Sequence, residues 1–257
     1  MRENHAKQKL KVGKPVLGCF VRYADADIAE FLSLQGFDLL VYDGEHGVLE
    51  PRDCQQMVRA AELHSVTPIV RPATNDQSLI LRYMDTGAQG VLMPMVESPR
   101  QAEEVVRSAK YPPIGKRGVA AVRAADYGQR EPIDQYTQIA NDNTLVCVQI
   151  ESTAGIDALP EIVSIDGIDV VFIGPSDLSS SLGVLGQLDH PKMQQAMDKI
   201  SRIVNNSPKK LGLMVPNADA AKQWIQRGAS FITVTCEMML KAGCHNYLAP
   251  IHKATTQ

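Results

Sequence analysis

Eight short apolar runs, each followed by a segment with helical periodicity, alternate from one end of this 257-residue chain to the other. Such alternation is typical of parallel strands joined by crossover helices. Each run has the continuous apolar character of a strand buried on both faces, which favours closure into a barrel over an open sheet. We therefore predict a (β/α)8 TIM barrel, a single α/β domain over residues 1–257 with its core at about 16–249. The predicted strands are 16–21, 39–42, 68–71, 90–93, 145–150, 170–173, 211–215 and 231–235.

Two features refine this prediction. A dinucleotide-binding sheet would carry G-x-G-x-x-G at its first strand-to-helix turn, where this chain has residues Arg22 to Asp25 instead. The connection over residues 110–143 is rich in Pro, Gly and Arg and is too long for a plain turn. Long structured loops of this kind tend to be lids or subunit contacts, so we expect one of these roles here.

Charge and cysteine content limit the partners. The formal net charge of −3 gives no broad cationic field, which argues against nucleic acid or an anionic membrane surface and favours a small molecule. The five cysteines are odd in number and include no C-x-x-C pair, as expected for reduced thiols in the cytoplasm. Since no apolar run has the length of a signal peptide or a membrane span, we expect a soluble cytoplasmic protein.

Ionisable side chains follow the predicted strands at their carboxyl ends, where barrels place their active sites. Glu151 and Asp177 end adjacent strands and would place two carboxylates around one cation, a hard-oxygen site suited to Mg²⁺, with Mn²⁺ or Co²⁺ as alternatives. The other interpretation is that these carboxylates cap the following helices or pair with Arg71.

The remaining strand-end residues suggest acid-base chemistry on an anion. His46 is the natural general base because its pKa lies close to neutrality, with Asp43 orienting the imidazole; alternatively, His46 is a structural residue bonded to a loop carbonyl. Arg71 ends a buried run, where a guanidinium would be costly without an anion to bind. Gln149 lies on the same side of its strand as Glu151 and would contact substrate or metal-bound water, or else fill a polar layer of the barrel.

Several chemistries lack their signature residues. No lysine lies in a strand interior, which disfavours a Schiff-base aldolase. The loops after the seventh and eighth strands lack the glycine-rich amides that bind phosphate in barrels, so we expect an unphosphorylated substrate. No G-x-S-x-G elbow is present to support serine hydrolysis.

Six motifs in order carry a family resemblance. The chain resembles the HpcH/HpaI family of class II pyruvate aldolases from about Val16 to about Gly243. The motifs are YDGEHG at 42–47, VRP at 70–72, VLMPMV at 91–96, YPPIGKRG at 111–118, QIE at 149–151 and FIGPSDLS at 172–179.

The resemblance implies specific roles. Glu151 and Asp177 would hold the metal that chelates pyruvate or its enolate, Arg71 would stabilise the developing oxyanion, and the His46–Asp43 pair would handle the aldol proton. The implied reaction is cleavage of a 4-hydroxy-2-oxo acid to pyruvate and an aldehyde. Members are usually hexamers, dimers of trimers, with the last helix packed on a neighbour; residues 117–123 are the candidate contribution to a neighbour's mouth.

Other outcomes stay open at this point. The same scaffold supports oxaloacetate decarboxylation and a siderophore-type citrate synthase, and a non-catalytic metabolite-binding barrel is the alternative from another class. The charged residues at the strand ends argue against a non-catalytic barrel, because such a protein would not need to keep charged groups in its mouth. The chain departs from the common family pattern at Gly47, at Ser176, a further candidate for substrate binding, and at Arg123. If Arg123 reaches the mouth, a second carboxylate on the substrate is expected.

Overall fold

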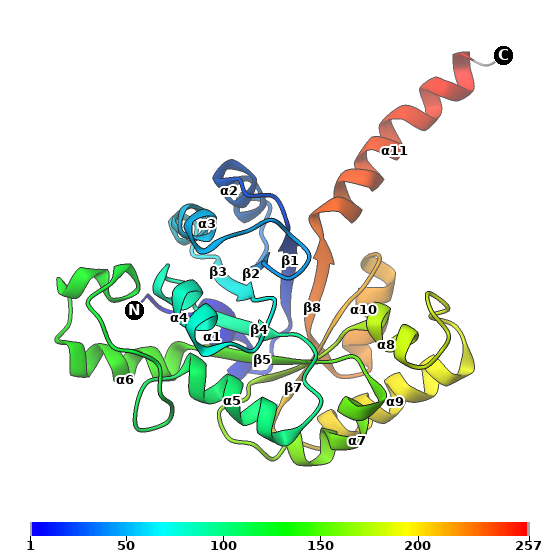
Figure 1. Ribbon diagram of the computed structural model, residues 1–257. Coiled ribbons are helices and arrows are strands. Elements are labelled where there is room, and N and C mark those ends of the chain that lie inside the picture. Colours follow the sequence, from blue (N-terminus) through cyan, green and yellow to red (C-terminus); the bar gives the residue numbers. More distant parts are fainter. Residues whose placement is uncertain (1, 256–257) are drawn as a thin grey trace.

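The computed structural model describes residues 2–255 and forms a closed barrel of eight parallel strands, each paired with its sequence neighbours (Figure 1). Every observed strand lies within two residues of its predicted bounds, and the predicted TIM barrel is confirmed. The strands are β1 (Val16–Val21), β2 (Leu39–Asp43), β3 (Thr67–Arg71), β4 (Gly90–Met93), β5 (Leu145–Ile150), β6 (Val170–Ile173), β7 (Lys210–Met214) and β8 (Ala229–Thr235).

Helices surround this barrel, and several begin at a polar cap placed just after a strand. The side chains of Asp25, Asp76, Ser98, Ser152 and Asn217 each accept a hydrogen bond from a backbone N–H of the first helical turn. The helices are α1 (His5–Lys11), α2 (Ala26–Leu34), α3 (Pro51–Leu63), α4 (Gln77–Asp85), α5 (Pro99–Ala109), η1 (Arg123–Gly128, a 3-10 helix), α6 (Ile133–Asn143), α7 (Thr153–Ile162), α8 (Pro175–Ser181), α9 (Pro191–Asn205), α10 (Ala218–Gln226) and α11 (Cys236–Thr255).

The core has two layers. A large apolar cluster lies between the strands and the surrounding helices, and a smaller one fills the barrel interior. In the interior, Phe172 makes edge-to-face contacts with Phe20 and Phe231, each with ring centroids 6.0 Å apart. These aromatic rings form a packed floor beneath the carboxyl ends of the strands.

Helix α1 closes the opposite end of the barrel. Ala6 and Leu10 are buried and join the interior cluster. The Lys7 ammonium, also buried, lies 2.9 Å from Asp169 Oδ2. The Asn4 amide donates hydrogen bonds to the carbonyls of Gln89 and Asn143.

The long connection between α5 and β5 is a packed substructure. Arg117 is buried, donates to Asp85 at 2.8 Å and lies over the ring of Tyr111. Tyr111 in turn packs edge-to-face against Tyr136 of α6, with centroids 5.7 Å apart. These contacts anchor the segment against α4 and leave residues 119–121 exposed.

The last helix, α11, leaves the barrel and projects away from it (Figure 1). Beyond its first turn several apolar side chains are exposed, including Tyr247 at 72%, Leu240, Leu248 and Ile251. Over residues 2–255, no helix combines the length and apolar character needed to span a bilayer.

Candidate active site

A small cavity of about 80 Å³ opens at the carboxyl ends of the strands. The aromatic rings of Phe20 and Phe172 form its floor. Five residues predicted from the sequence line this cavity, together with Arg22, which was not predicted. The polar residues of the wall are Arg22, His46, Arg71, Gln149, Ser176 and Asp177.

Arg71 is fixed in place from three sides. Its Nε and Nη2 donate to the two oxygens of Asp43 at 2.9 and 2.6 Å, a bidentate pair that follows from their side-by-side positions on β3 and β2. Nη1 lies 3.1 Å from Glu45 Oε2, in an ion pair without hydrogen-bond geometry. The guanidinium carbon lies 4.8 Å from the centre of the Phe20 ring. A buried cation is thus held rigidly at the cavity wall.

Asp43 makes different contacts from those expected. Its carboxylate accepts from Arg71, from Arg22 Nε at 3.1 Å and from the backbone N–H groups of Glu45 and His46, rather than from the imidazole ring. The turn after β2 bends back over Asp43, so the amide of His46 occupies the place predicted for its ring. Burial alone would raise the pKa of Asp43, but Arg71, the His46 amide and Arg22 together hold it below its usual value.

His46 lies at the rim, with 52% of its side chain exposed. Its Nε2 is 3.6 Å from Glu45 Oε2, so the carboxylate that faces the imidazole is Glu45. Burial raises the pKa of Glu45 even though Arg71 and His46 act to lower it. Sequence reasoning assigned no role to Glu45, because the direction of its side chain depends on this turn.

Glu151 and Gln149 form a buried polar pair at the end of β5, in which Gln149 lines the cavity and Glu151 lies outside its lining. Glu151 Oε1 accepts from the Met95 N–H at 2.7 Å, and Oε2 accepts from Gln149 Nε2. Gly174 leaves room for this pair, because a Cβ there would displace both side chains from their present positions. The pKa of Glu151 is raised to about 7, first by burial and further by the charges of Asp177 and Glu45.

These residues fit a divalent cation. Gln149 Oε1 is buried without a hydrogen-bond partner, and the charge of Asp177 reaches the buried Glu151. A cation would relieve the repulsion between the carboxylates. Within residues 2–255 no three His, Cys, Asp or Glu side chains form a metal-binding group, so a cation here would have two protein carboxylates and complete its shell with water and substrate.

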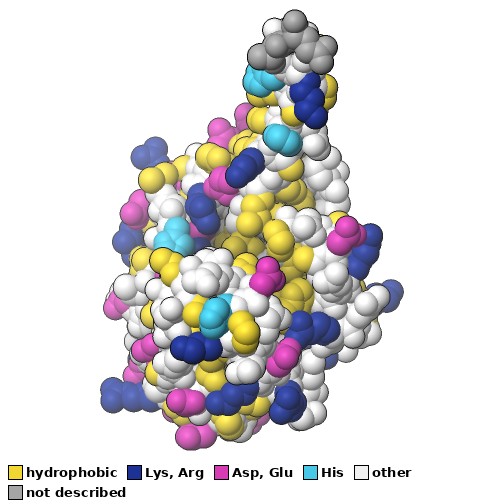
Figure 2. Space-filling view, turned by 90° about the vertical axis from the view of Figure 1, so that its right-hand side faces the viewer, with side chains coloured by type: hydrophobic (Ala, Val, Ile, Leu, Met, Phe, Trp, Pro, Cys, Tyr) yellow, Lys and Arg dark blue, Asp and Glu magenta, His cyan; other side chains and the backbone are white. Residues whose placement is uncertain are grey.

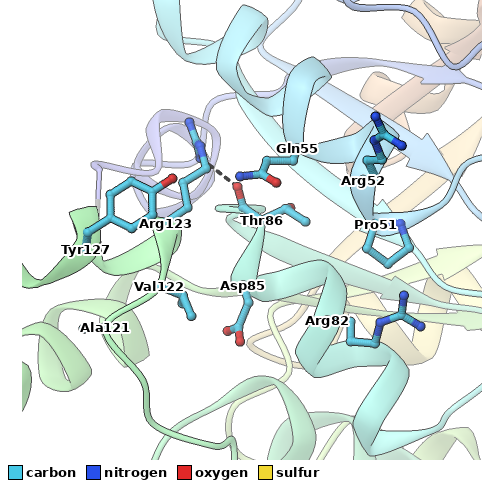
Figure 3. Close-up of a pocket in the computed structure, with 10 residues that line it drawn as sticks. All are labelled: Pro51, Arg52, Gln55, Arg82, Asp85, Thr86, Ala121, Val122, Arg123 and Tyr127. Carbon is cyan, nitrogen blue, oxygen red and sulfur yellow. Dashed lines mark hydrogen bonds between the residues drawn. The ribbon is translucent and has the colours of Figure 1, made fainter.

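Arg123 is not brought to this cavity. Its Nη2 lies 2.5 Å from Glu62 Oε2, and its Nη1 donates to the Thr86 carbonyl at 2.7 Å (Figure 3). It lines a separate cavity of about 510 Å³, beside α3 and α4, together with Arg52 and Arg82 (Figure 3). The buried Glu62 carboxylate explains this placement, because it needs a cation close by.

Arg22 was missed, although its signal was available. It follows β1 directly, the position type that singled out the other strand-end residues. Its side chain is 36% exposed, and it lies in the cavity wall.

Comparison with known proteins identifies the family of this chain. Residues 16–242 match the family model described as HpcH/HpaI aldolase/citrate lyase. The chain is 38% identical to the hydroxypyruvate/pyruvate aldolase of Roseobacter denitrificans, over 93% of this chain and 94% of that one. It is 37% identical to a 4-hydroxy-2-oxo-heptane-1,7-dioate aldolase of Escherichia coli, over 96% of this chain and 94% of that one. The expectation of an enzyme of the aldolase class is confirmed.

Solved structures share the fold closely. A family protein from Burkholderia cenocepacia superposes with a TM-score of 0.91 at 32% identity, covering 97% of this chain and 99% of that one. The citrate synthase SbnG has a TM-score of 0.88 at 25% identity, covering 98% of both chains. Sequence and structure agree that the chain belongs to the HpcH/HpaI aldolase/citrate lyase family.

Proposed function

We propose that this protein is a metal-dependent aldolase that cleaves a 4-hydroxy-2-oxo acid to pyruvate and an aldehyde. One observation carries the proposal: the cavity is lined by the guanidinium of Arg71, the imidazole of His46 and the carboxylate of Asp177, and its Gln149 side chain holds the buried Glu151 carboxylate. Arg71 and His46 follow β3 and β2, whereas Glu151 and Asp177 follow β5 and β6. This arrangement suits a substrate that develops negative charge on its 2-oxo oxygen and loses a proton from its 4-hydroxyl group.

Arg71 would bind and orient the 2-oxo acid. Its guanidinium is already fixed by Asp43 and Glu45, so little reorganisation is needed when negative charge develops on the oxo oxygen. The rings of Phe20 and Phe172 exclude water from beneath the reacting carbons. Gln149 and Ser176 supply further polar atoms to the same cavity.

His46 would accept the proton of the 4-hydroxyl group. As the O–H bond breaks, its electrons form the aldehyde C=O, the C3–C4 bond breaks, and that electron pair forms the enolate of pyruvate. The neighbouring Glu45 carboxylate stabilises the imidazolium that results. The position of His46 at the rim lets the aldehyde leave to solvent.

Glu151 and Asp177 would hold the cation, for which we propose Mg²⁺ because both ligands are hard oxygens, with Mn²⁺ or Co²⁺ as substitutes. The bound cation would polarise the 2-oxo carbonyl as a Lewis acid. Gln149 would keep Glu151 oriented toward it.

The first test is pyruvate release from a panel of 4-hydroxy-2-oxo acids, with and without EDTA. We expect release that EDTA abolishes and Mg²⁺ restores, because the cation would polarise the 2-oxo carbonyl. Oxaloacetate is run in parallel, because the likeness to SbnG leaves a citrate-forming or decarboxylating enzyme as the second candidate. Turnover of oxaloacetate alone would reject the aldolase proposal in favour of that candidate.

We also propose that the protein assembles through α11, as a hexamer built from two trimers that acts in the cytoplasm. An apolar groove of about 400 Å³ lies on the barrel beside the base of α11, and hydrophobic side chains gather on this face below the projecting helix (Figure 2). Its lining includes Leu17, Phe37, Ile232 and Met239. A neighbour's α11 would cover the face of β1 and β8 that this chain's own helix leaves open. The exposed residues 119–121 would lie near a neighbour's mouth.

Substitution within α11 tests this assembly. We expect Leu248→Asp with Ile251→Asp to dissociate the oligomer, since each change places a charge in an apolar contact. Light scattering coupled to size-exclusion chromatography would report the mass, with Lys253→Glu on the same helix as a control for added negative charge. A monomeric wild-type protein, or a double variant of wild-type mass, would rule out the proposal.

A further inference from the structure

Arg22 has a guanidinium fork that the fold leaves open. Its Nε donates to Asp43 at 3.1 Å, while its two terminal amino groups make no hydrogen bond with any residue in the described range 2–255. Asp43 does not depend on this contact, because it already accepts two bonds from Arg71 and two from backbone amides. The contact therefore fixes the direction of the Arg22 side chain and leaves the end of the fork available to an anion.

The position of Arg22 in the barrel indicates which part of the substrate would carry this anion. In the closed order β1 to β8, β1 lies opposite β5 and β2 lies opposite β6. The 2-oxo acid end of a substrate belongs at Glu151 and Asp177, on the β5 and β6 side. His46, after β2, would meet the 4-hydroxyl group. A chain that continues beyond C4 then runs toward the end of β1, where Arg22 lies.

We propose that Arg22 binds a carboxylate on the aldehyde half of the substrate and gives the enzyme a preference for 4-hydroxy-2-oxo acids with a second, distal carboxylate. This inference rests on the proposed aldolase function. It assigns to Arg22 the role that the sequence suggested for Arg123, which is engaged by Glu62 outside this cavity. A guanidinium suits the role because its fork matches a carboxylate.

The test compares two aldehydes of the same shape that differ in charge. Aldol addition of pyruvate to 4-oxobutanoate and to 4-methylpentanal is measured for wild type, Arg22→Gln and Arg22→Lys. We expect Arg22→Gln to lower kcat/KM for 4-oxobutanoate by about ten- to hundredfold, the value of a charge-assisted hydrogen bond, with little change for 4-methylpentanal. Arg22→Lys should recover part of the loss. Arg52→Gln, an exposed arginine outside the cavity, is the matched control.

A parallel measurement tests the proposed aldolase function separately from the role of Arg22. Exchange of the methyl protons of pyruvate in D₂O, followed by NMR, needs no aldehyde and reports enolate formation alone. Exchange in Arg22→Gln should equal that of wild type. Equal losses for both aldehydes would overturn the proposal and make Arg22 a support for Asp43, and impaired exchange would assign it to the pyruvate carboxylate. Absence of exchange in wild type would instead reject the aldolase function itself.

Discussion

Exchanging both candidate metal ligands, Glu151→Gln with Asp177→Asn, is expected to lower kcat by about a thousandfold or more. Lewis-acid stabilisation of a developing oxyanion contributes several kcal/mol, and each 1.36 kcal/mol is a factor of ten in rate. Both substitutions preserve side-chain size. The loss should therefore reflect the charge and coordination of the two oxygens.

A readout that does not depend on turnover completes this test. Mn²⁺ binding, followed by electron paramagnetic resonance, should be lost in the double variant. Asp157→Asn with Glu161→Gln, two exposed positions on α7, is the matched control for the change in charge. In EDTA the double variant should unfold no more readily than wild type, because it removes the buried Glu151 charge. Retained Mn²⁺ binding with normal turnover would show that the metal lies elsewhere.

Arg71→Met should cost both activity and stability. It removes the group that faces the developing oxyanion, for which a loss of about a hundred- to a thousandfold in kcat is expected. It also leaves Asp43, which is fully buried, without its bidentate partner. Because Arg22 remains beside Asp43, we expect the lower end of the usual cost, about 3 kcal/mol in the free energy of unfolding. Urea unfolding with steady-state kinetics measures both.

The pH dependence of that stability gives a sharper signature. In wild type the pKa of Asp43 lies below its unfolded value of 3.8, so its contribution is present above that pH and is lost only as pH falls through the lowered value. Without Arg71, the bonds from the His46 amide and Arg22 remain, but the largest contribution that opposes burial is gone, so we expect the pKa of Asp43 to rise and its buried charge to become less favourable. The deficit of Arg71→Met should therefore shrink as the pH is lowered from 7. Arg71→Met with Asp43→Asn should recover stability but not activity, and a deficit unchanged with pH would argue against this account.

The sequence predicted the barrel well because its signals are local. Strands buried on both faces must be continuously apolar, and the polar residue that ends each run marks the mouth. This reasoning predicted a common mouth for His46, Arg71, Gln149 and Asp177, and all four line one cavity. The buried Glu151 beside Gln149 follows from the same strand.

What the sequence could not predict depends on turns and on packing between distant segments. The contacts of Asp43 are set by how residues 44–47 fold back, which strand periodicity does not encode. Arg123 faces Glu62, a residue 61 positions earlier that is buried by packing of α3. The sequence of α11 also does not predict that this helix projects away from its own barrel. Its pattern of apolar residues is compatible with a helix that covers the barrel.

Helix α1, which closes the end of the barrel opposite the active site, also constrains the order in which the chain folds during synthesis. Helix α1 has only seven residues, too few to be stable alone in water. It is translated before every strand of the barrel, yet its partners extend from Asp38 and Thr67 to Thr144 and Asp169. The chain must therefore be synthesised as far as Asp169 before this helix can make all of these contacts. A segment that precedes all eight strands in the chain can therefore complete its contacts only after most of the strands have been made.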